Sequence, residues 1–319
     1  MKRLFFHFLV SLLVGFTFLA IPRAVRAQNL PTAPHIQVRL ISSVTGAGRP
    51  KTITAGVEMK LPPGWDTYWR TPGETGLPPV FDWQGSQNLR SAKVLWPAPT
   101  RYVSFGIQYF GYSDDVVFPI MVVPRTSGAA VGLHLNLHFL VCKGICVPQQ
   151  RTLTLEIPAG EAKTNVNKPL LAAALKNIPS DAGRNMFSIK RVWLARSGKK
   201  VFFHAEGHVR TAPKQHADLF IETQSGVSFG KPRFTYNSRT QKLEMRAPLR
   251  TGNTIRELER KLNGTPVTLT YVSGNTAYER HVPFSDMQRI HTLHVNLKIL
   301  LYALLGVLVV GVIVLKIKK

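Results

Sequence analysis

The stretch LHLNLHFLVCKGICVPQQRTLTLEI, residues 133–157, predicts two β-strands joined by a turn that carries both cysteines of the chain. Apolar and polar residues alternate over 133–139, and they alternate again over 152–157. A period of two is typical of a strand that buries one face on a core. We therefore expect a hairpin with Cys142 and Cys146 at the connection between its strands.

Short β-rich runs, separated by stretches that contain glycine or proline, recur along most of the chain. Besides the stretch above, strand signals lie at 36–42, 53–61 and 116–123, and hairpin turns at 196–199 and 273–275. Many short strands with frequent turns favour β-sandwiches. The sequence therefore predicts a mainly β protein with two β-sandwich domains.

The first 27 residues have the three parts of a secretory signal peptide. Lys2 and Arg3 form a basic start, an apolar run follows, and small residues flank Arg26 where a signal peptidase cuts. We expect cleavage after Ala27. The alternative is an uncleaved N-terminal membrane anchor.

The other end of the chain carries an uncharged apolar run at 299–315, with lysines on both sides. As a helix it would be roughly 25 Å long, the short limit for spanning a bilayer. The basic tail at 316–319 marks the C-terminal side as cytoplasmic. We therefore expect one transmembrane helix at 299–315 after a juxtamembrane segment at 288–298, although a buried core helix would show the same run.

Between these ends, composition divides the chain into two folding units and a connector. The expected parts are a first sandwich domain at 28–160, a linker at 161–185 with a short helix at 169–175, and a second sandwich domain at 186–287. Another helix is expected at 254–262, with Thr254 as its N-cap and Gly264 after its end.

The chain is strongly basic, with a formal net charge of +24 at pH 7, or +20 without the four basic residues of the signal peptide. Such a charge suits anionic lipid headgroups or an acidic partner. An exported protein without a recognised nucleic-acid motif is not expected to bind nucleic acid. A generally basic surface is the alternative to any specific partner.

The cysteine pair has three explanations that the residues themselves leave open. A structural disulfide would close a ring of five residues and contribute roughly 2 kcal/mol. A redox pair is favoured by Gly144, which lets the chain reverse, and by Lys143, which favours a thiolate at its neighbour. A copper or zinc site would add His134 and His138, which lie about 13 Å apart along a strand.

The surroundings of the pair resemble the end of the N-terminal exported domain of DsbD-type thiol:disulfide interchange proteins, most closely the ScsB branch. LVCKGICVP at 140–148 carries the resemblance together with WDTYWRTPGETGLP at 65–78. Trp83, LWPAP at 95–99 and YFGY at 109–112 follow the same pattern. The resemblance covers most of residues 36–158 and extends more weakly over the second unit.

The resemblance implies immunoglobulin-like β-sandwich domains in a bacterial periplasm that pass electrons to a thioredoxin-fold partner. Together with the expected signal peptide and terminal helix, this predicts a protein of the bacterial inner membrane, and no cofactor is expected. The resemblance also implies that Cys142 and Cys146 are the catalytic pair, with Cys146 forming the mixed disulfide and Cys142 resolving it. Tyr109 and Phe110 match the family's aromatic cap, although core or rim aromatics would look the same. Lys143 is a further candidate for contact with the partner.

The resemblance has two departures. The family has a wider spacing between its two cysteines, and its electron-supplying membrane and thioredoxin domains are not recognised in this sequence. We therefore expect a separate protein to reduce the pair. The alternatives are a non-catalytic periplasmic binding or assembly protein with a structural disulfide, and a copper-handling protein.

Overall fold

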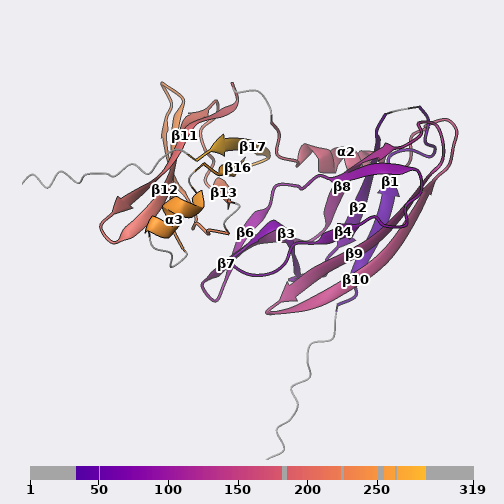
Figure 1. Cartoon of the computed structure of the whole chain (residues 1–319), viewed down its shortest axis with the longest axis horizontal. Helices are drawn as coiled ribbons and strands as arrows, with labels where there is room; N and C mark the ends of the chain where they lie inside the picture. The colour runs from indigo at the N-terminus through magenta and orange to yellow at the C-terminus, as the bar shows by residue number, and fades with distance from the viewer. Residues whose placement is uncertain are drawn as a thin grey trace, which may run out of the picture. The chain divides into compact units, whose positions relative to one another are not determined.

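β-Strands make up most of the computed structural model, which describes residues 34–49, 51–181, 185–223, 226–250, 255–262 and 264–284 (Figure 1). The predicted mainly β class is confirmed. The predicted signal peptide and C-terminal membrane helix lie outside the described residues. Within those ranges, no helix is long and apolar enough to cross a bilayer.

Two antiparallel sheets enclose the first core. One has the strand order β1-β2-β8-β5, and the other has the order β10-β9-β3-β7-β6 with β4 beside β9. The strands are β1 (Gln37–Ser42), β2 (Ile53–Lys60), β3 (Asp66–Gly73), β4 (Val80–Asp82), β5 (Leu89–Val94), β6 (Thr100–Ser104), β7 (Ile107–Ser113), β8 (Val116–Pro124), β9 (Val131–Lys143) and β10 (Ile145–Ile157). Two sheets that share one core form a β-sandwich, as immunoglobulin-like domains do.

Alternate residues of β9 fill this core. Leu133, Leu135 and Leu137 are 0–1% exposed, whereas the residues between them are more exposed. Phe118 on β8 faces them from the other sheet and is fully buried. Burying each such side chain contributes about 1.5–3 kcal/mol. The alternation predicted over 133–139 is therefore confirmed, and the long hairpin is a principal part of the core.

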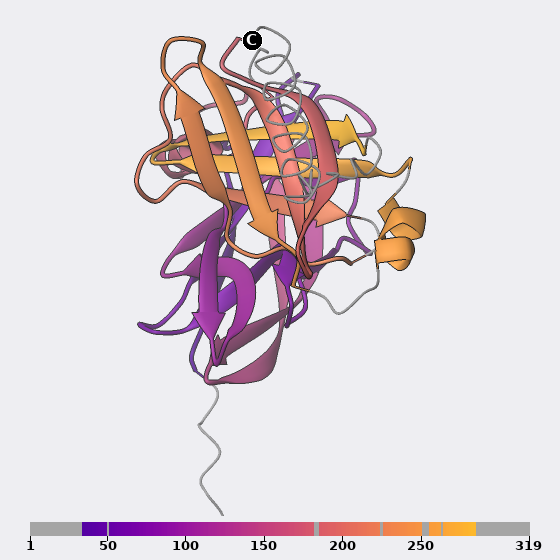
Figure 2. The same cartoon turned by 90° about the vertical axis from the view of Figure 1, so that its left-hand side faces the viewer.

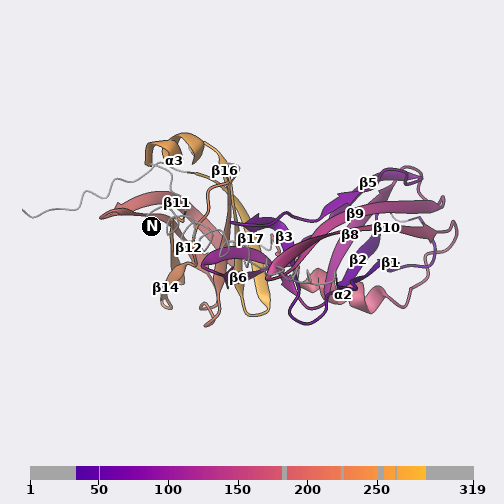
Figure 3. The same cartoon turned by 90° about the horizontal axis from the view of Figure 1, so that it is seen from below.

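Helix α2 (Lys168–Lys176) lies against β2 and β8 of the first sandwich (Figures 1 and 3). Its Leu171 is 1% exposed and reaches Gly56 on β2, where an added Cβ would come within 2.5 Å of the leucine side chain. Gly56 thus leaves the space that the helix occupies. The short helix predicted at 169–175 is confirmed, with its proline in the first turn.

Two further antiparallel sheets enclose a second core, with strand orders β11-β12-β15-β14 and β13-β16-β17. In Figure 2 the yellow β16–β17 hairpin runs across the direction of the red and orange strands of the other sheet. The strands are β11 (Phe187–Ser197), β12 (Lys200–Val209), β13 (Asp218–Thr223), β14 (Arg233–Asn237), β15 (Lys242–Pro248), β16 (Pro266–Ser273) and β17 (Thr276–Pro283).

Both predicted hairpin turns of this second part are confirmed. Gly198 connects β11 to β12 and Gly274 connects β16 to β17, each with a φ of 60° that favours glycine. Helix α3 (Ile255–Leu262) confirms the helix predicted at 254–262, while its expected N-cap lies outside the described residues. The described residues from Ile36 onward belong to one compact unit, and the domain boundaries given above stay predictions.

Candidate functional site

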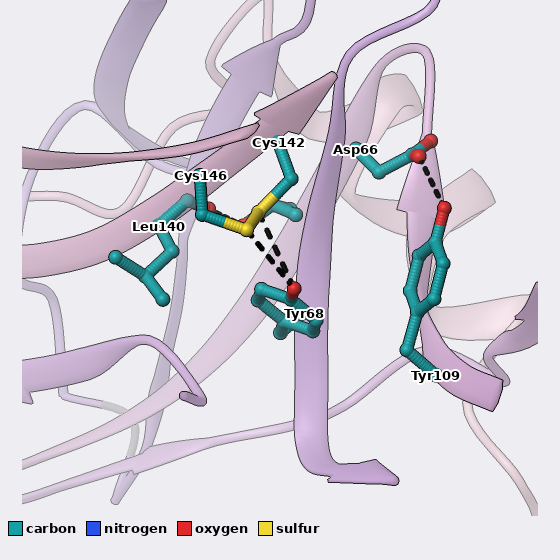
Figure 4. Close-up of a disulfide and its surroundings, with 7 residues drawn as sticks. Asp66, Tyr68, Tyr109, Leu140, Cys142 and Cys146 are labelled. Carbon is teal, nitrogen blue, oxygen red and sulfur yellow. Dashed lines mark hydrogen bonds between the residues drawn. A yellow bond between two sulfur atoms is a disulfide. The ribbon is translucent and has the colours of Figure 1, made fainter. Parts of the chain in front are cut away.

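The two cysteines form a disulfide at the tip of the β9–β10 hairpin (Figure 4). Cys146 is the direct cross-strand partner of Cys142, and their Cα atoms are 4.0 Å apart. Gly144 makes the turn with a φ of 74°, in the region that favours glycine. The chain reversal that such a short bridge requires is therefore supplied by the hairpin itself.

The two sulfur-bearing residues differ in their access to solvent. Cys142 is 9% exposed and lies at the edge of the core, whereas Cys146 is exposed. A protein or small thiol from outside therefore reaches Cys146 first. This asymmetry suits the roles that the family resemblance implied, with an outer attacking sulfur and an inner resolving one.

Tyr68 on β3 places its hydroxyl group 3.3 Å from both sulfur atoms (Figure 4). A disulfide has no S–H group, so the phenol donates and the sulfurs accept. Burial, and secondarily the charge of Asp66, raises the pKa of Tyr68 above its ordinary value of 10.0. The hydroxyl therefore keeps its proton at neutral pH and can donate it in a hydrogen bond to a sulfur that becomes a thiolate.

A second polar pair lies beside this contact. Tyr109 on β7 donates a hydrogen bond of 2.7 Å to Asp66, whose Cα pairs with that of Cys142 across the sheet. Burial raises the pKa of Asp66, the Tyr109 hydrogen bond opposes that shift, and the charge of Asp114 adds to it. Burial and then the Asp66 carboxylate raise the pKa of Tyr109. The pair thus combines a neutral phenol with a carboxyl group that takes up a proton more readily than usual.

The aromatic rings of the site contact one another. The Tyr109 ring meets the Tyr68 ring edge-on at a centroid distance of 5.9 Å, and it stacks on Tyr102 at 5.2 Å. On another side, the loop after β3 lies directly on Tyr68, because an added Cβ at Gly76 would come within 2.1 Å of the phenol ring. Tyr68 is accordingly only 3% exposed.

The predicted cap and contact residues lie in three different environments. Tyr109 reaches the disulfide through Tyr68 and stays a candidate for the cap. Phe110 points to the other side of β7, is 5% exposed and packs edge-on against Phe220, which fits the alternative of a core aromatic. Lys143 is exposed beside the disulfide, with its Nζ 3.4 Å from the Pro63 carbonyl oxygen, and its role stays a prediction.

The histidines considered for a metal site lie along β9, opposite Thr154 and Gln150 of β10. His134 is partly buried, and its backbone amide donates to Ser86. Among the residues that the structure describes, no three His, Cys, Asp or Glu side chains come close enough to hold a metal ion.

From the sequence, Asp66, Tyr68 and Gly76 were recognised only as parts of the motif at 65–78, without a role of their own. Their importance depends on the register between β3 and β9, which places Asp66 opposite Cys142. That register joins segments 76 residues apart and is not visible in either segment. The aromatic and glycine content of 65–78 was the one available signal.

Family comparisons match two parts of the chain. Residues 38–158 match the family described as thiol:disulfide interchange protein DsbD, N-terminal. The matched range contains every residue of the disulfide site described above. Residues 38–158 form a DsbD-type N-terminal domain. The resemblance predicted from the sequence is therefore confirmed, and residues 177–287 match a domain of unknown function.

Among solved structures, the N-terminal periplasmic domain of ScsB from Proteus mirabilis is similar, with 20% identity and a TM-score of 0.60. The match covers 81% of this chain and 96% of that one, so it includes residues of both sandwiches and shows that the DsbD-type domain and the following one share its fold. The C-terminal domain of AspA, an antigen I/II-family protein of Streptococcus pyogenes, is 7% identical over 77% of this chain and 97% of that one. Its TM-score of 0.16 is too low to indicate a shared fold. No curated protein matches the chain.

Proposed function

We propose that the chain is a membrane-anchored periplasmic protein whose Cys142–Cys146 pair exchanges disulfides with thioredoxin-fold proteins. One observation carries the proposal: an exposed cysteine and a buried one pair at a hairpin tip, with the Tyr68 hydroxyl group against both sulfurs. The DsbD-type domain supports the partner class. The predicted signal peptide and the apolar run at 299–315 support the location.

The exchange begins with the reduced pair. The Cys146 thiolate attacks one sulfur of the partner's disulfide, and the partner's other sulfur leaves as a thiolate. The Cys142 thiolate then attacks Cys146, reforms the intramolecular disulfide and releases the partner's second thiolate. Two electrons pass to the partner, and each released thiolate takes a proton from solvent. A dithiol protein must reduce the pair before the next cycle.

Tyr68 and the strand pairing assist different parts of this cycle. The Tyr68 hydroxyl stabilises whichever sulfur of the pair carries negative charge. It therefore raises the fraction of Cys146 that is thiolate, and it favours the departure of Cys142 when the pair is reduced again. The pairing of Cys142 with Cys146 holds the resolving sulfur beside the mixed disulfide, so the second attack is intramolecular.

The test uses the full chain in detergent and a thioredoxin-fold protein that keeps only its exposed cysteine, activated with thionitrobenzoate. Cys142→Ala, which retains the exposed Cys146, is expected to form the mixed disulfide rapidly and stoichiometrically. Cys146→Ala, which retains the buried Cys142, is the matched control and should react much more slowly. Failure of Cys142→Ala to form an adduct would make the bridge a structural disulfide.

The location is tested separately. A fusion of the full chain should remain in the inner membrane after alkaline washing, and external protease should reach the described domains only after the outer membrane is opened. Recovery of the intact chain in the soluble periplasmic fraction would contradict the anchor and leave the exchange chemistry standing.

A further inference from the structure

Two strands that carry site residues also contact the second sandwich with their opposite faces. On β3, Tyr68 turns to the sulfurs while Trp69 turns away and meets Phe220 of β13 edge-on at 5.6 Å. On β7, Tyr109 turns to Asp66 while Phe110 meets Phe220 at 5.0 Å. Neighbouring residues of a strand point to opposite faces, so one side chain of the second sandwich touches the strand neighbours of both site tyrosines.

Phe220 is a full member of the first core. It is 1% exposed and belongs to the same cluster of buried residues as Trp69 and Phe110. Its neighbours in the strand, Leu219 and Ile221, belong to the second core instead. Strand β13 therefore contributes to both cores at once.

A buried ion pair fixes this contact. Arg101 on β6 binds Asp218 of β13 through two hydrogen bonds of 2.8 and 3.0 Å, and the two side chains are 6% and 11% exposed. The guanidinium group also lies over the Phe110 ring at 4.7 Å and over the Phe220 ring at 5.3 Å. A buried charge left without its partner is strongly unfavourable, so the pair resists separation.

Further polar contacts surround the ion pair. Arg70 directly follows Trp69 on β3. Its guanidinium group binds Glu222 at 2.5 Å and also pairs with Glu279. Gln108 is 3% exposed, directly precedes Tyr109 and donates to the Phe229 carbonyl oxygen at 2.7 Å. Each tyrosine of the site therefore has a strand neighbour bound by the second sandwich.

We infer that Asp218 and Phe220 of the second sandwich are positioning residues for the disulfide site, holding β3 and β7 so that the Tyr68 hydroxyl stays against the sulfurs. The inference rests on the proposed exchange function for its biological meaning. It assigns a role to the part of the chain that matches a domain of unknown function. Neither residue touches the sulfurs, so both act through Trp69, Phe110 and Arg101.

The test measures thiol reactivity in the full reduced chain, without any partner protein. Asp218→Asn keeps the shape of the side chain and removes its charge. It is expected to shift the midpoint of alkylation of Cys146 by iodoacetamide to higher pH, in the same direction as Tyr68→Phe. Reduction of the disulfide by dithiothreitol should slow by at least about threefold, because a less stabilised thiolate leaves more slowly.

Two further variants isolate the route of the effect. The double variant Tyr68→Phe/Asp218→Asn should show the same midpoint as Tyr68→Phe alone, since Asp218 acts through the hydroxyl that is already gone. Glu206→Gln is the matched control, because it removes a carboxylate that pairs with Arg191 inside the second sandwich. It should leave the midpoint and the dithiothreitol rate unchanged.

The inference is overturned if Asp218→Asn folds with a native near-ultraviolet spectrum and keeps the parent's midpoint, or if its shift adds fully to that of Tyr68→Phe. Should Asp218→Asn not fold, Phe220→Leu retains both charges and is judged by the same two measurements. Because no partner is present, these outcomes are independent of the mixed-disulfide experiment that tests the proposed function.

Discussion

Replacing Tyr68 with phenylalanine removes one hydroxyl group and leaves the ring that packs against Tyr109 and Gly76. In the disulfide form that hydroxyl lies 3.3 Å from both sulfurs. A hydrogen bond to a charged group contributes about 1.5–3 kcal/mol, and about 1.4 kcal/mol corresponds to one pH unit of titration. Because one hydroxyl is shared by two sulfurs, we expect a loss near the lower limit, or about one pH unit.

The assay is alkylation of the reduced full chain by iodoacetamide over a range of pH, with the Cys146 peptide quantified by mass spectrometry. The midpoint for Tyr68→Phe should lie about one unit above that of the parent chain. Tyr102→Phe is the control, because the Tyr102 hydroxyl contacts Ser113 at 2.9 Å while its ring stacks on Tyr109. An unchanged midpoint in Tyr68→Phe, or an equal shift in Tyr102→Phe, would refute the role given to the hydroxyl.

Three other expectations concern stability. Burial raises the pKa of Asp66 above 3.8, so the folded state keeps the carboxyl proton to a higher pH than the unfolded state does. Ionisation of Asp66 therefore lowers the stability of the parent chain as pH rises from 3.8 through the folded-state pKa. Asp66→Asn should therefore gain melting temperature relative to the parent between pH 3.8 and neutrality, and a constant difference across that range would contradict the assignment. Leu135→Ala empties a fully buried position and should lower the free energy of unfolding by about 2–5 kcal/mol in denaturant titration, with exposed Leu77 as the control site. Reducing the disulfide opens only a short ring and should lower the free energy of unfolding by no more than about 2 kcal/mol in the same titration. A larger loss would favour a structural bridge.

The elements that could be predicted from the sequence are those whose signals are local. The alternation over 133–139 depends only on which face of one strand meets the core, and the structure has Leu133, Leu135 and Leu137 buried as expected. Gly198 and Gly274 identify their hairpins for a similar reason, since a φ of 60° is costly for other residues. Local chemistry therefore identified strands, turns and the mainly β class.

The candidate site was predictable only in part, because it is assembled by long-range pairing. The residue type and spacing of the cysteines identify them as a candidate pair, and the flanking strands place them at a turn. Tyr68 and Asp66 acquire their roles from the pairing of β3 with β9, and no periodicity within β3 indicates that partner. Tyr109 and Phe110 are both aromatic, and both were cap candidates from the sequence. The alternation along β7 turns only Tyr109 toward Asp66, while Phe110 packs against Phe220.

The geometry of the hairpin also bears on whether the bridge is a staple or a working pair. A cross-link stabilises a protein mainly by restricting the unfolded chain, and a ring of five residues restricts it little. Here the pairing from Val131↔Ile157 to Lys143↔Ile145 already holds both strands together without the bridge. The same pairing keeps the two cysteines opposite each other after reduction, so the bridge can reform without a search for its partner. A disulfide that adds little to the fold, and that the fold itself helps to restore, is suited to being broken and remade in each cycle of exchange.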